Sequence, residues 1–232
     1  GGEGNPVDKF GPLFKSAVLT AMLLRPILYY NGLEQGVGQR ENVIGDLSKS
    51  VDTAKAIPYD IPVAIDWTKT NEDNRAYLAK VLAVGEEHAA TFDRGVMEVL
   101  EPNYDAPLAA WSVTDGLGTT FVMAANWSEQ HAGAQFRFDK AVLKDLGAFV
   151  PQAGRRYRFT DKLSGLSFER DGGELRERGL YIELPGAGTH LFQVTEVFPA
   201  NPATSLSAPN DAPRPGEGLP RAAAHDARLV EA

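Results

Sequence analysis

The stretch RPILYYNGLEQGVG, residues 25–38, decides how the rest of the chain is interpreted. Pro26 opens a continuous apolar run, residues 27–30, of the kind expected for a strand buried on both faces, as in a parallel sheet. Glycines follow the run and enclose one carboxylate, Glu34, so the chain is expected to turn there. The stretch predicts a short buried strand that ends in a loop with a lone acid.

Helical periodicity flanks this strand on both sides. Upstream, apolar residues recur every three or four positions over residues 12–24. Downstream, residues 32–63 carry no sustained period and predict a long loop, and a second helical face covers residues 77–88. Thr70 and Asp73 have the spacing of a capping box, which predicts that the second helix begins after Thr70. Helix, buried strand, loop and helix together predict an α/β unit.

After Gly95 the pattern changes to short β-rich runs separated by turn residues. Asp115-Gly116 and Asp171-Gly172 are turn signals between such runs. Seven or so runs of this kind predict an antiparallel sandwich of roughly a hundred residues. The runs are residues 96–100, 108–113, 120–126, 135–138, 156–159, 180–184 and 190–197.

Composition excludes several functional classes. The chain has 232 residues and is 43% hydrophobic, which is enough for a real core. Its net charge of -8 and its scattered Lys and Arg lack the basic footprint of nucleic-acid binding. The absence of cysteine excludes disulfides, thiolate metal sites and a cysteine nucleophile. The longest apolar stretch is too short and interrupted to cross a bilayer, so we expect a soluble protein without a membrane partner, in the cytoplasm or secreted.

The order of these pieces resembles the carboxyl-terminal part of the α-amylase family, glycoside hydrolase family 13. PILYYNGLEQG, residues 26–36, resembles that family's last barrel strand, and RAYLAKVLAVGEEHAATFDRG, residues 75–95, resembles its final barrel helix. Three further stretches resemble its carboxyl-terminal sandwich: TTFVMAANWSEQ at 119–130, YRFTDKLSGLSF at 157–168 and LYIELPGAGTHLFQVTEV at 180–197. The resemblance covers about residues 12–197.

The resemblance implies a fold class and a domain organisation. The fold is expected to be an α/β barrel fragment, the end of a TIM barrel, followed by an all-β antiparallel sandwich. Residues 1–94 are then the carboxyl-terminal part of a (β/α)₈ catalytic barrel, and residues 95–198 are the sandwich domain. Residues 199–232 are rich in Pro, Ala, Asn and Gly, a composition that predicts a disordered tail.

The resemblance also implies a function for the parent enzyme. Such an enzyme hydrolyses or transfers α-1,4-linked glucose units with retention at the anomeric carbon, so its ligand is an α-glucan or maltooligosaccharide. The family's catalytic carboxylates come from earlier barrel strands and have no counterpart here. The chain is therefore expected to be inactive without its missing N-terminal barrel portion. The pair His225-Asp226 lies in the predicted tail and is not a catalytic match. No cofactor is expected in this chain, whereas the parent enzyme could bind calcium.

The loop after the predicted strand holds the candidate substrate-binding residues Tyr30, Asn31 and Glu34. In a (β/α)₈ barrel the loops at the carboxyl ends of the strands line the active site. Either tyrosine of the pair 29–30 could offer its ring to a sugar, and a purely core role for both is an equal alternative. Glu34 could contact sugar or a catalytic neighbour, but we favour the alternative that it accepts backbone N–H bonds and holds the loop.

Metal and glycan sites are the remaining alternatives. The four histidines lack the close spacing of a zinc site. Four acids between residues 60 and 73 could hold calcium but lack EF-hand spacing, so a solvated loop is favoured. Asn126-Trp127-Ser128 matches a glycosylation sequon, whereas the resemblance makes Asn126 structural. Trp111 is predicted to be core, and Trp127 is left open between core and sugar platform.

A different class of protein fits the same pattern. A non-catalytic carbohydrate-binding or interaction module could keep one α/β unit as a collar on a β-sandwich. The two hypotheses differ in what Phe14, Val18, Ile27 and Leu28 face. In a barrel fragment they expose an apolar patch, whereas in a module they pack on the sandwich.

Overall fold

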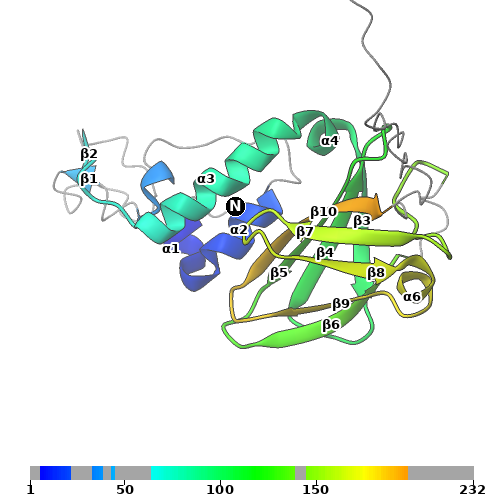
Figure 1. Cartoon of the computed structure of the whole chain (residues 1–232). Coiled ribbons are helices and arrows are strands. Elements are labelled where there is room, and N and C mark those ends of the chain that lie inside the picture. Colours follow the sequence, from blue (N-terminus) through cyan, green and yellow to red (C-terminus); the bar gives the residue numbers. More distant parts are fainter. Residues whose placement is uncertain (1–5, 22–32, 39–42, 45–63, 139–144, 198–232) are drawn as a thin grey trace, which may run out of the picture. The chain divides into compact units, whose positions relative to one another are not determined.

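The computed structural model describes residues 6–21, 33–38, 43–44, 64–138 and 145–197 (Figure 1). The largest feature of this part is an antiparallel β sheet. Eight strands form one sheet in the order β8-β7-β10-β5-β4-β3-β6-β9. The strands are β3 (Val96–Pro102), β4 (Leu108–Thr114), β5 (Thr120–Asn126), β6 (Ala132–Arg137), β7 (Arg156–Asp161), β8 (Ser167–Asp171), β9 (Leu180–Leu184) and β10 (Thr189–Val197).

The helices precede the sheet in sequence, apart from one short helix between β8 and β9. Two short strands, β1 (Val43–Ile44) and β2 (Ala64–Ile65), pair with each other and come between η2 and α3 in the sequence. The helices are α1 (Pro6–Phe10), η1 (Gly11–Leu13), α2 (Phe14–Ala21), η2 (Leu33–Gln35), α3 (Glu72–Glu87), α4 (Ala89–Arg94) and α6 (Gly172–Glu177). None of those described is both long and apolar enough to span a membrane.

The sheet curls around an inner core. Only two residue pairs, Glu101↔Arg137 and Pro102↔Phe136, join β3 to β6, so the sheet bends sharply at this seam. Alternate residues of the strands on both sides of the seam then point into one cluster. The inner core includes Leu100, Ala110, Val122, Phe136, Phe159, Leu180, Ile182 and Phe192. The strand runs were predicted as a sandwich, and the structure shows them as one curled antiparallel sheet.

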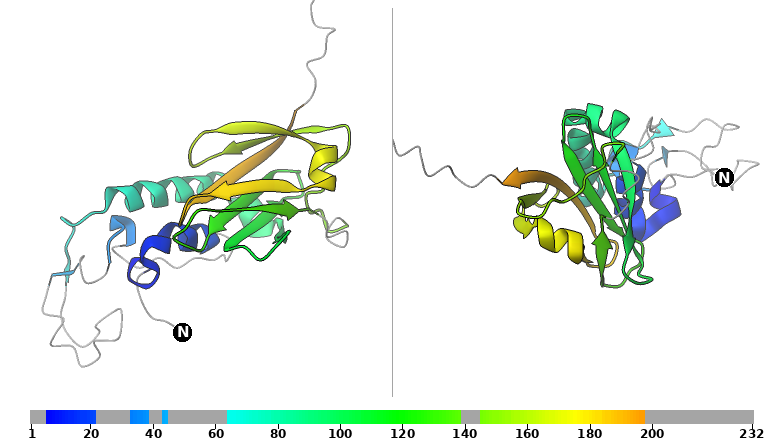
Figure 2. Two further views of the ribbon diagram at one scale, coloured as in Figure 1. Left: turned by 90° about the horizontal axis from the view of Figure 1, so that it is seen from below. Right: turned by 90° about the vertical axis from the view of Figure 1, so that its right-hand side faces the viewer.

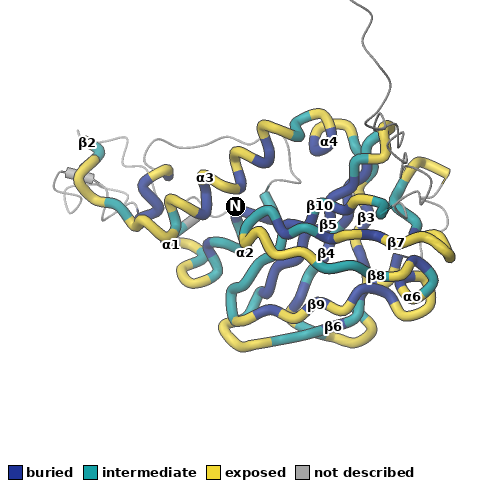
Figure 3. The backbone as a smooth tube through the Cα atoms, viewed as in Figure 1, coloured by how far each residue is buried: buried dark blue, intermediate teal, exposed yellow. Residues whose placement is uncertain are grey.

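A second core lies on the outer face of the same sheet. The odd-numbered residues Phe121 and Met123 of β5 point away from the inner core and pack under the helices. Phe14 and Leu19 of α2 and Val81 of α3 close this outer core. Figure 2 shows α1 and α2 on one side of the green strands and α6 on the other. Figure 3 shows α3 alternating between buried and exposed residues along its length, as an amphipathic helix does.

Several sequence predictions need correction. Strand β8 was missed, and Asp171-Gly172 was predicted to be a turn but begins α6. The Asp171 carboxylate caps that helix, because its Oδ1 accepts hydrogen bonds from Gly173 N (2.8 Å) and Glu174 N (3.2 Å). Asp115-Gly116 is a turn between β4 and β5, as predicted. The predicted barrel strand at residues 27–30 and the predicted tail lie outside the described residues, and the domain boundary at 94/95 stays a prediction.

Candidate functional site

The structure describes one of the three predicted substrate-binding residues. Glu34 lies in η2 and is exposed, between the buried residues Leu33 and Gln35. Tyr30 and Asn31 lie outside the described residues. The roles predicted for all three residues therefore stay predictions, and the described part of the loop, residues 33–38, shows what holds the site in place.

The loop is attached to the beginning of α3 through backbone groups. The Gln35 carbonyl accepts a hydrogen bond from Asn71 N at 2.8 Å, and the Gly36 carbonyl accepts one from Asn74 Nδ2 at 2.9 Å. Gly36 has a φ of +67°, and a Cβ there would lie 2.6 Å from Asn74 Cβ. Only glycine allows this backbone conformation and this close approach without strain. The loop therefore cannot shift without disturbing the start of α3.

The cap of α3 differs from the prediction. Asn71, and not Thr70, is the N-cap residue, and its side-chain oxygen accepts a hydrogen bond from Asn74 N at 3.1 Å. Both residue types cap helices, so the spacing of Thr70 and Asp73 was an ambiguous signal. Asn71 also donates its backbone N–H to Gln35, so one residue caps the helix and binds the loop.

Gln35 is the most unusual side chain of the loop. It is buried, with 4% of its surface exposed, and its Nε2 donates to the Asp66 carbonyl at 2.6 Å. Within the part of the chain that the structure describes, Gln35 Oε1 has no hydrogen-bond partner. No sequence pattern singled out this residue, because glutamine in a loop is ordinarily solvated. It connects the predicted sugar-facing loop to the segment before α3.

The acids near the loop have local partners. The Asp66 carboxylate accepts hydrogen bonds from Thr68 N and Oγ1 at 3.1 and 2.6 Å. The side-chain hydrogen bond from Thr68 is the main reason why the pKa of Asp66 lies below its ordinary value. Asp73 forms an ion pair with Lys15 at 2.7 Å. Over the described ranges no three acidic or histidine side chains gather as a metal site would require.

Tyr77 connects the helices to the sheet. Its hydroxyl donates to the Lys15 carbonyl at 3.0 Å and lies 3.0 Å from Thr189 Oγ1 at the start of β10. Burial raises the pKa of Tyr77, and the hydrogen bond with Thr189 offsets only part of that effect. The phenol therefore stays neutral and acts as a hydrogen-bonding bridge between α2, α3 and β10.

Asp161 is the centre of a second polar cluster, at the end of β7. Ser164 Oγ and His190 Nδ1 both contact its Oδ2, at 2.7 and 2.9 Å, and its Oδ1 accepts from Leu163 N and Leu191 N. Burial opposes the charged form, but these four hydrogen bonds outweigh it and lower the pKa of Asp161. In a catalytic triad the histidine lies between the serine and the carboxylate. Here serine and histidine both contact the same carboxylate oxygen, so the cluster stabilises the turn after β7 and is not a catalytic triad.

Asn126 has a structural role in this fold. It is fully buried, and its Nδ2 donates to the carbonyls of Gln130 (2.7 Å), Pro185 (2.9 Å) and Leu184 (3.3 Å). A buried amide with these partners is not accessible for glycosylation. Trp127, left open above, is half-buried with its ring edge-on to Phe10. Trp111 is also half-buried and packs against the outer core.

Comparisons with known proteins give distant likenesses only. No protein-family model matches the chain, and no curated protein matches it. A noncanonic maltogenic α-amylase, AmyB from Thermotoga neapolitana, is 11% identical with a TM-score of 0.47, over 79% of this chain and 37% of that one. The trehalulose synthase MutB from Pseudomonas mesoacidophila MX-45 is 11% identical with a TM-score of 0.47, over 83% of this chain and 41% of that one.

A third solved structure is similar over a shorter part. It is a GH27 β-L-arabinopyranosidase from Geobacillus stearothermophilus, 19% identical with a TM-score of 0.35, over 60% of this chain and 26% of that one. The chain thus spans less than half the length of each of these structures. At such values the likenesses say nothing about function, so the proposal below rests on the motifs and contacts already described.

Proposed function

We propose that this chain is the carboxyl-terminal part of a retaining glycoside hydrolase or transglycosidase of the α-amylase type, acting on α-glucans or maltooligosaccharides. The observation that carries the proposal is the chain of contacts behind the predicted sugar-facing loop. Loop residues Gln35 and Gly36 bond to the start of α3, and Tyr77 of α3 bonds to β10 of the sheet. This is the arrangement expected if the sheet braces the end of a barrel.

The chain's part in the reaction is positioning. Retention needs a nucleophilic carboxylate and a second carboxylic acid about 5 Å apart, on either side of the scissile bond. We assign those acids to a barrel portion outside this sequence. Tyr30, Asn31 and Glu34 are proposed to shape the floor of the sugar cleft, and the contacts to α3 keep the described part of that loop at a fixed distance from the sheet. A misplacement of about 1 Å in such a support can cost on the order of 100-fold in rate.

One observation favours the second candidate, a carbohydrate-binding module. Phe14 and Val18 are only 1% and 8% exposed, and both lie in the outer core beneath the helices. A module with a helical collar requires this packing. The expectation that a barrel fragment exposes Phe14 and Val18 is therefore wrong, and their burial favours the module at this point. Ile27 and Leu28, the other two residues of that comparison, lie outside the described residues.

The native gene product tests the proposal. Its mass and reading frame show whether barrel strands with carboxylates accompany this chain. We expect a product that cleaves maltoheptaose and first releases the α-anomer, seen by ¹H NMR, whereas the 232-residue chain alone releases no sugar. A native product that binds maltoheptaose but never cleaves it would establish the module instead.

Glu34 provides a sharper test within that product. Glu34→Gln is expected to lower kcat/KM for maltoheptaose about tenfold if the side chain contacts sugar. Glu72→Gln is the matched control, because Glu72 is an exposed acid at the start of α3. It forms an ion pair with Arg75 at 3.4 Å. If Glu34→Gln changes stability and leaves kinetics intact, Glu34 is a structural loop residue.

A further inference from the structure

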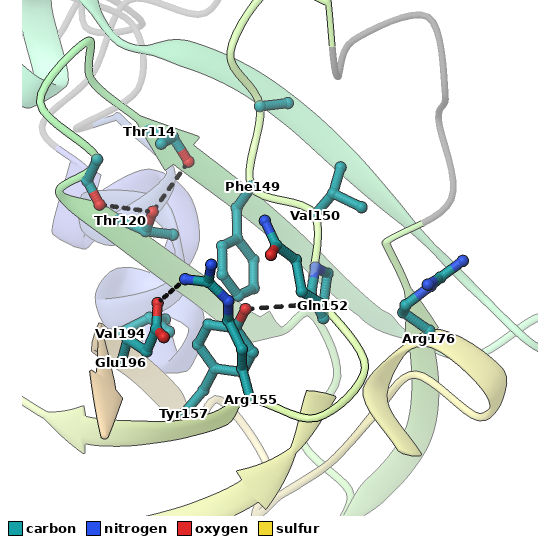
Figure 4. Close-up of a pocket in the computed structure, with 13 residues that line it drawn as sticks. Thr114, Thr120, Phe149, Val150, Gln152, Arg155, Tyr157, Arg176, Val194 and Glu196 are labelled. Atoms are coloured by element: carbon teal, nitrogen blue, oxygen red, sulfur yellow. Dashed lines mark hydrogen bonds and ion pairs between the residues drawn. The ribbon is translucent and has the colours of Figure 1, made fainter. Parts of the chain in front are cut away.

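A pocket lies at one end of the inner core, far along the chain from the loop discussed above. Its volume is about 420 Å³, within the range of roughly 300–1,000 Å³ typical of small-molecule sites. The ends of β4, β5, β7 and β10 form one side, and residues 148–152, here called the strap, form the other. Figure 4 shows these side chains around the hollow.

The floor of the pocket is polar because the strand pattern changes there. Along β4 and β5 the inward residues near the middle of the sheet are apolar except Ser112, and the last inward positions are Thr114 and Thr120. The two threonines are 6% and 2% exposed, and their hydroxyl oxygens lie 3.1 Å apart. Thr120 Oγ1 also donates to the Gly118 carbonyl at 3.4 Å, so the pair keeps acceptor lone pairs for the hydroxyl protons of a guest.

The strap is held firmly, so the pocket is preformed. Gln152 N donates to the Tyr157 hydroxyl at 3.1 Å, and the Phe149 ring packs at right angles to the Tyr157 ring, 5.2 Å away. Gly172 N donates to the Arg155 carbonyl at 2.7 Å. A Cβ on Gly172 would lie 2.0 Å from the Gln152 carbonyl oxygen, so glycine is required for this close approach.

The rim carries a donor and an acceptor whose charges cancel. Arg155 Nη1 forms an ion pair with Glu196 Oε2 at 2.5 Å, and both side chains remain partly exposed, at 46% and 25%. Figure 4 shows this pair across the hollow, with the Phe149 ring beside it. A guanidinium and a carboxylate side by side offer several donors and acceptors to one ligand. Arg176 also lines the pocket (Figure 4), so the lining residues carry two positive charges and one negative charge.

We infer that this pocket binds a neutral sugar unit, separately from the loop at residues 33–38. Buried hydroxyls, an aromatic ring and a paired Arg–Glu rim match a guest with many hydroxyl groups and an apolar ring face. The choice of α-linked glucose as that guest rests on the proposed function. Glu196 already pairs with the Arg155 guanidinium, whereas Arg176 adds a positive charge to the lining, so inorganic phosphate is tested beside the sugar.

Titration of the full chain with maltotriose, followed by amide NMR, tests the inference. Saturable shifts are expected at Thr114, Thr120 and the strap. Arg155→Gln should weaken binding about tenfold, because a charge-assisted hydrogen bond is lost. Arg158→Gln in β7, three residues further along the chain, breaks the exposed pair with Glu169 at 2.8 Å. It is the matched control and should change binding less than about twofold.

A second pair of variants probes the floor without changing charge. Thr120→Val keeps the side-chain shape and removes one buried hydroxyl, so it should weaken maltotriose binding about fivefold. Thr195→Val changes an exposed residue of β10 in the same way and should leave binding unchanged. If Thr120→Val does not fold, Arg155→Gln still decides the question.

The outcomes separate this inference from the proposed function. Pocket shifts with cellotriose but not with maltotriose would support the sugar site and count against an α-glucan parent. Shifts with inorganic phosphate alone, absence of pocket shifts with any sugar, or unchanged binding by Arg155→Gln would overturn the sugar site. In those cases the cleavage assay on the native gene product still decides the proposed function by itself.

Discussion

Asn126 is the residue at which the end of β5 meets the turn before β10. Its amide group satisfies three backbone carbonyls, and its Oδ1 accepts from Ser128 N and Oγ at 3.0 and 2.9 Å. Asn126→Ala leaves several buried groups unpaired and is expected to lower the free energy of unfolding by about 3 kcal/mol. Urea denaturation measures this. Ser128→Ala, which removes one hydroxyl, should cost less than about 1 kcal/mol, and an equal loss in both variants would contradict the role given to Asn126.

Asp161 makes the stability of the fold depend on pH. Its hydrogen bonds to His190, Ser164 and two backbone N–H groups lower its pKa despite burial. The folded state therefore binds fewer protons than the unfolded state, whose aspartate pKa is about 3.9. The stabilisation is complete above that value and is lost as the pH falls through the lower pKa of the folded state.

This sign gives a direct test at the same residue. The urea midpoint of the natural chain should fall as the pH is lowered from 6 toward about 2, and Asp161→Asn should remove part of that slope. At neutral pH, Asp161→Asn is also expected to cost about 2 kcal/mol, because a charged acceptor is replaced. Ser164→Ala removes one of the four donors, so the pH dependence of its urea midpoint should be weaker than that of the natural chain and stronger than that of Asp161→Asn. Equal slopes for all three chains would show that Asp161 does not carry the dependence.

The first turn of α3 holds the loop at residues 33–38 in place through hydrogen bonds from Asn71 and Asn74. Asn71→Ala removes the side-chain cap seen at Asn74 N and is expected to lower the free energy of unfolding by about 1 kcal/mol. Thr70→Ala is the control, since Thr70 was the predicted cap and the structure gives that role to its neighbour. Thermal unfolding of both variants decides between them, and a larger loss for Thr70→Ala would restore the capping box.

Elements with strong periodicity were predictable from sequence, and contacts between distant elements were not. The three-and-four spacing of α2 follows from one dominant face, and β5 was predictable as a continuous apolar run because it is buried on both faces. Strand β8 was missed because its residues are half-buried or exposed, so no alternation marks it. The pocket was missed because Thr114, Thr120 and Glu196 meet only through strand register. Likewise, nothing in the sequence tells that Gln35 is buried.

At the scale of the whole molecule, the outer core joins the helices to the sheet. Phe14 of α2 packs in one cluster with Phe121 and Met123 of β5, although the sequence predicted a domain boundary between them. If the cluster couples the two parts, helix and sheet unfold together. Far-ultraviolet circular dichroism and the emission of Trp111 and Trp127, measured with Trp67 replaced by Phe, should then give coincident urea transitions.

Phe14→Ala tests this coupling directly. The substitution empties the centre of the outer core, so it should lower the free energy of unfolding by about 3–5 kcal/mol and move both transitions to the same lower urea concentration. Val99→Ala, on the exposed face of β3 with 48% of its surface accessible, is the control and should move neither by much. Loss of the helical signal at low urea, with the amide NMR signals of the sheet still dispersed, would show instead that residues 1–94 and 95–198 are separate domains.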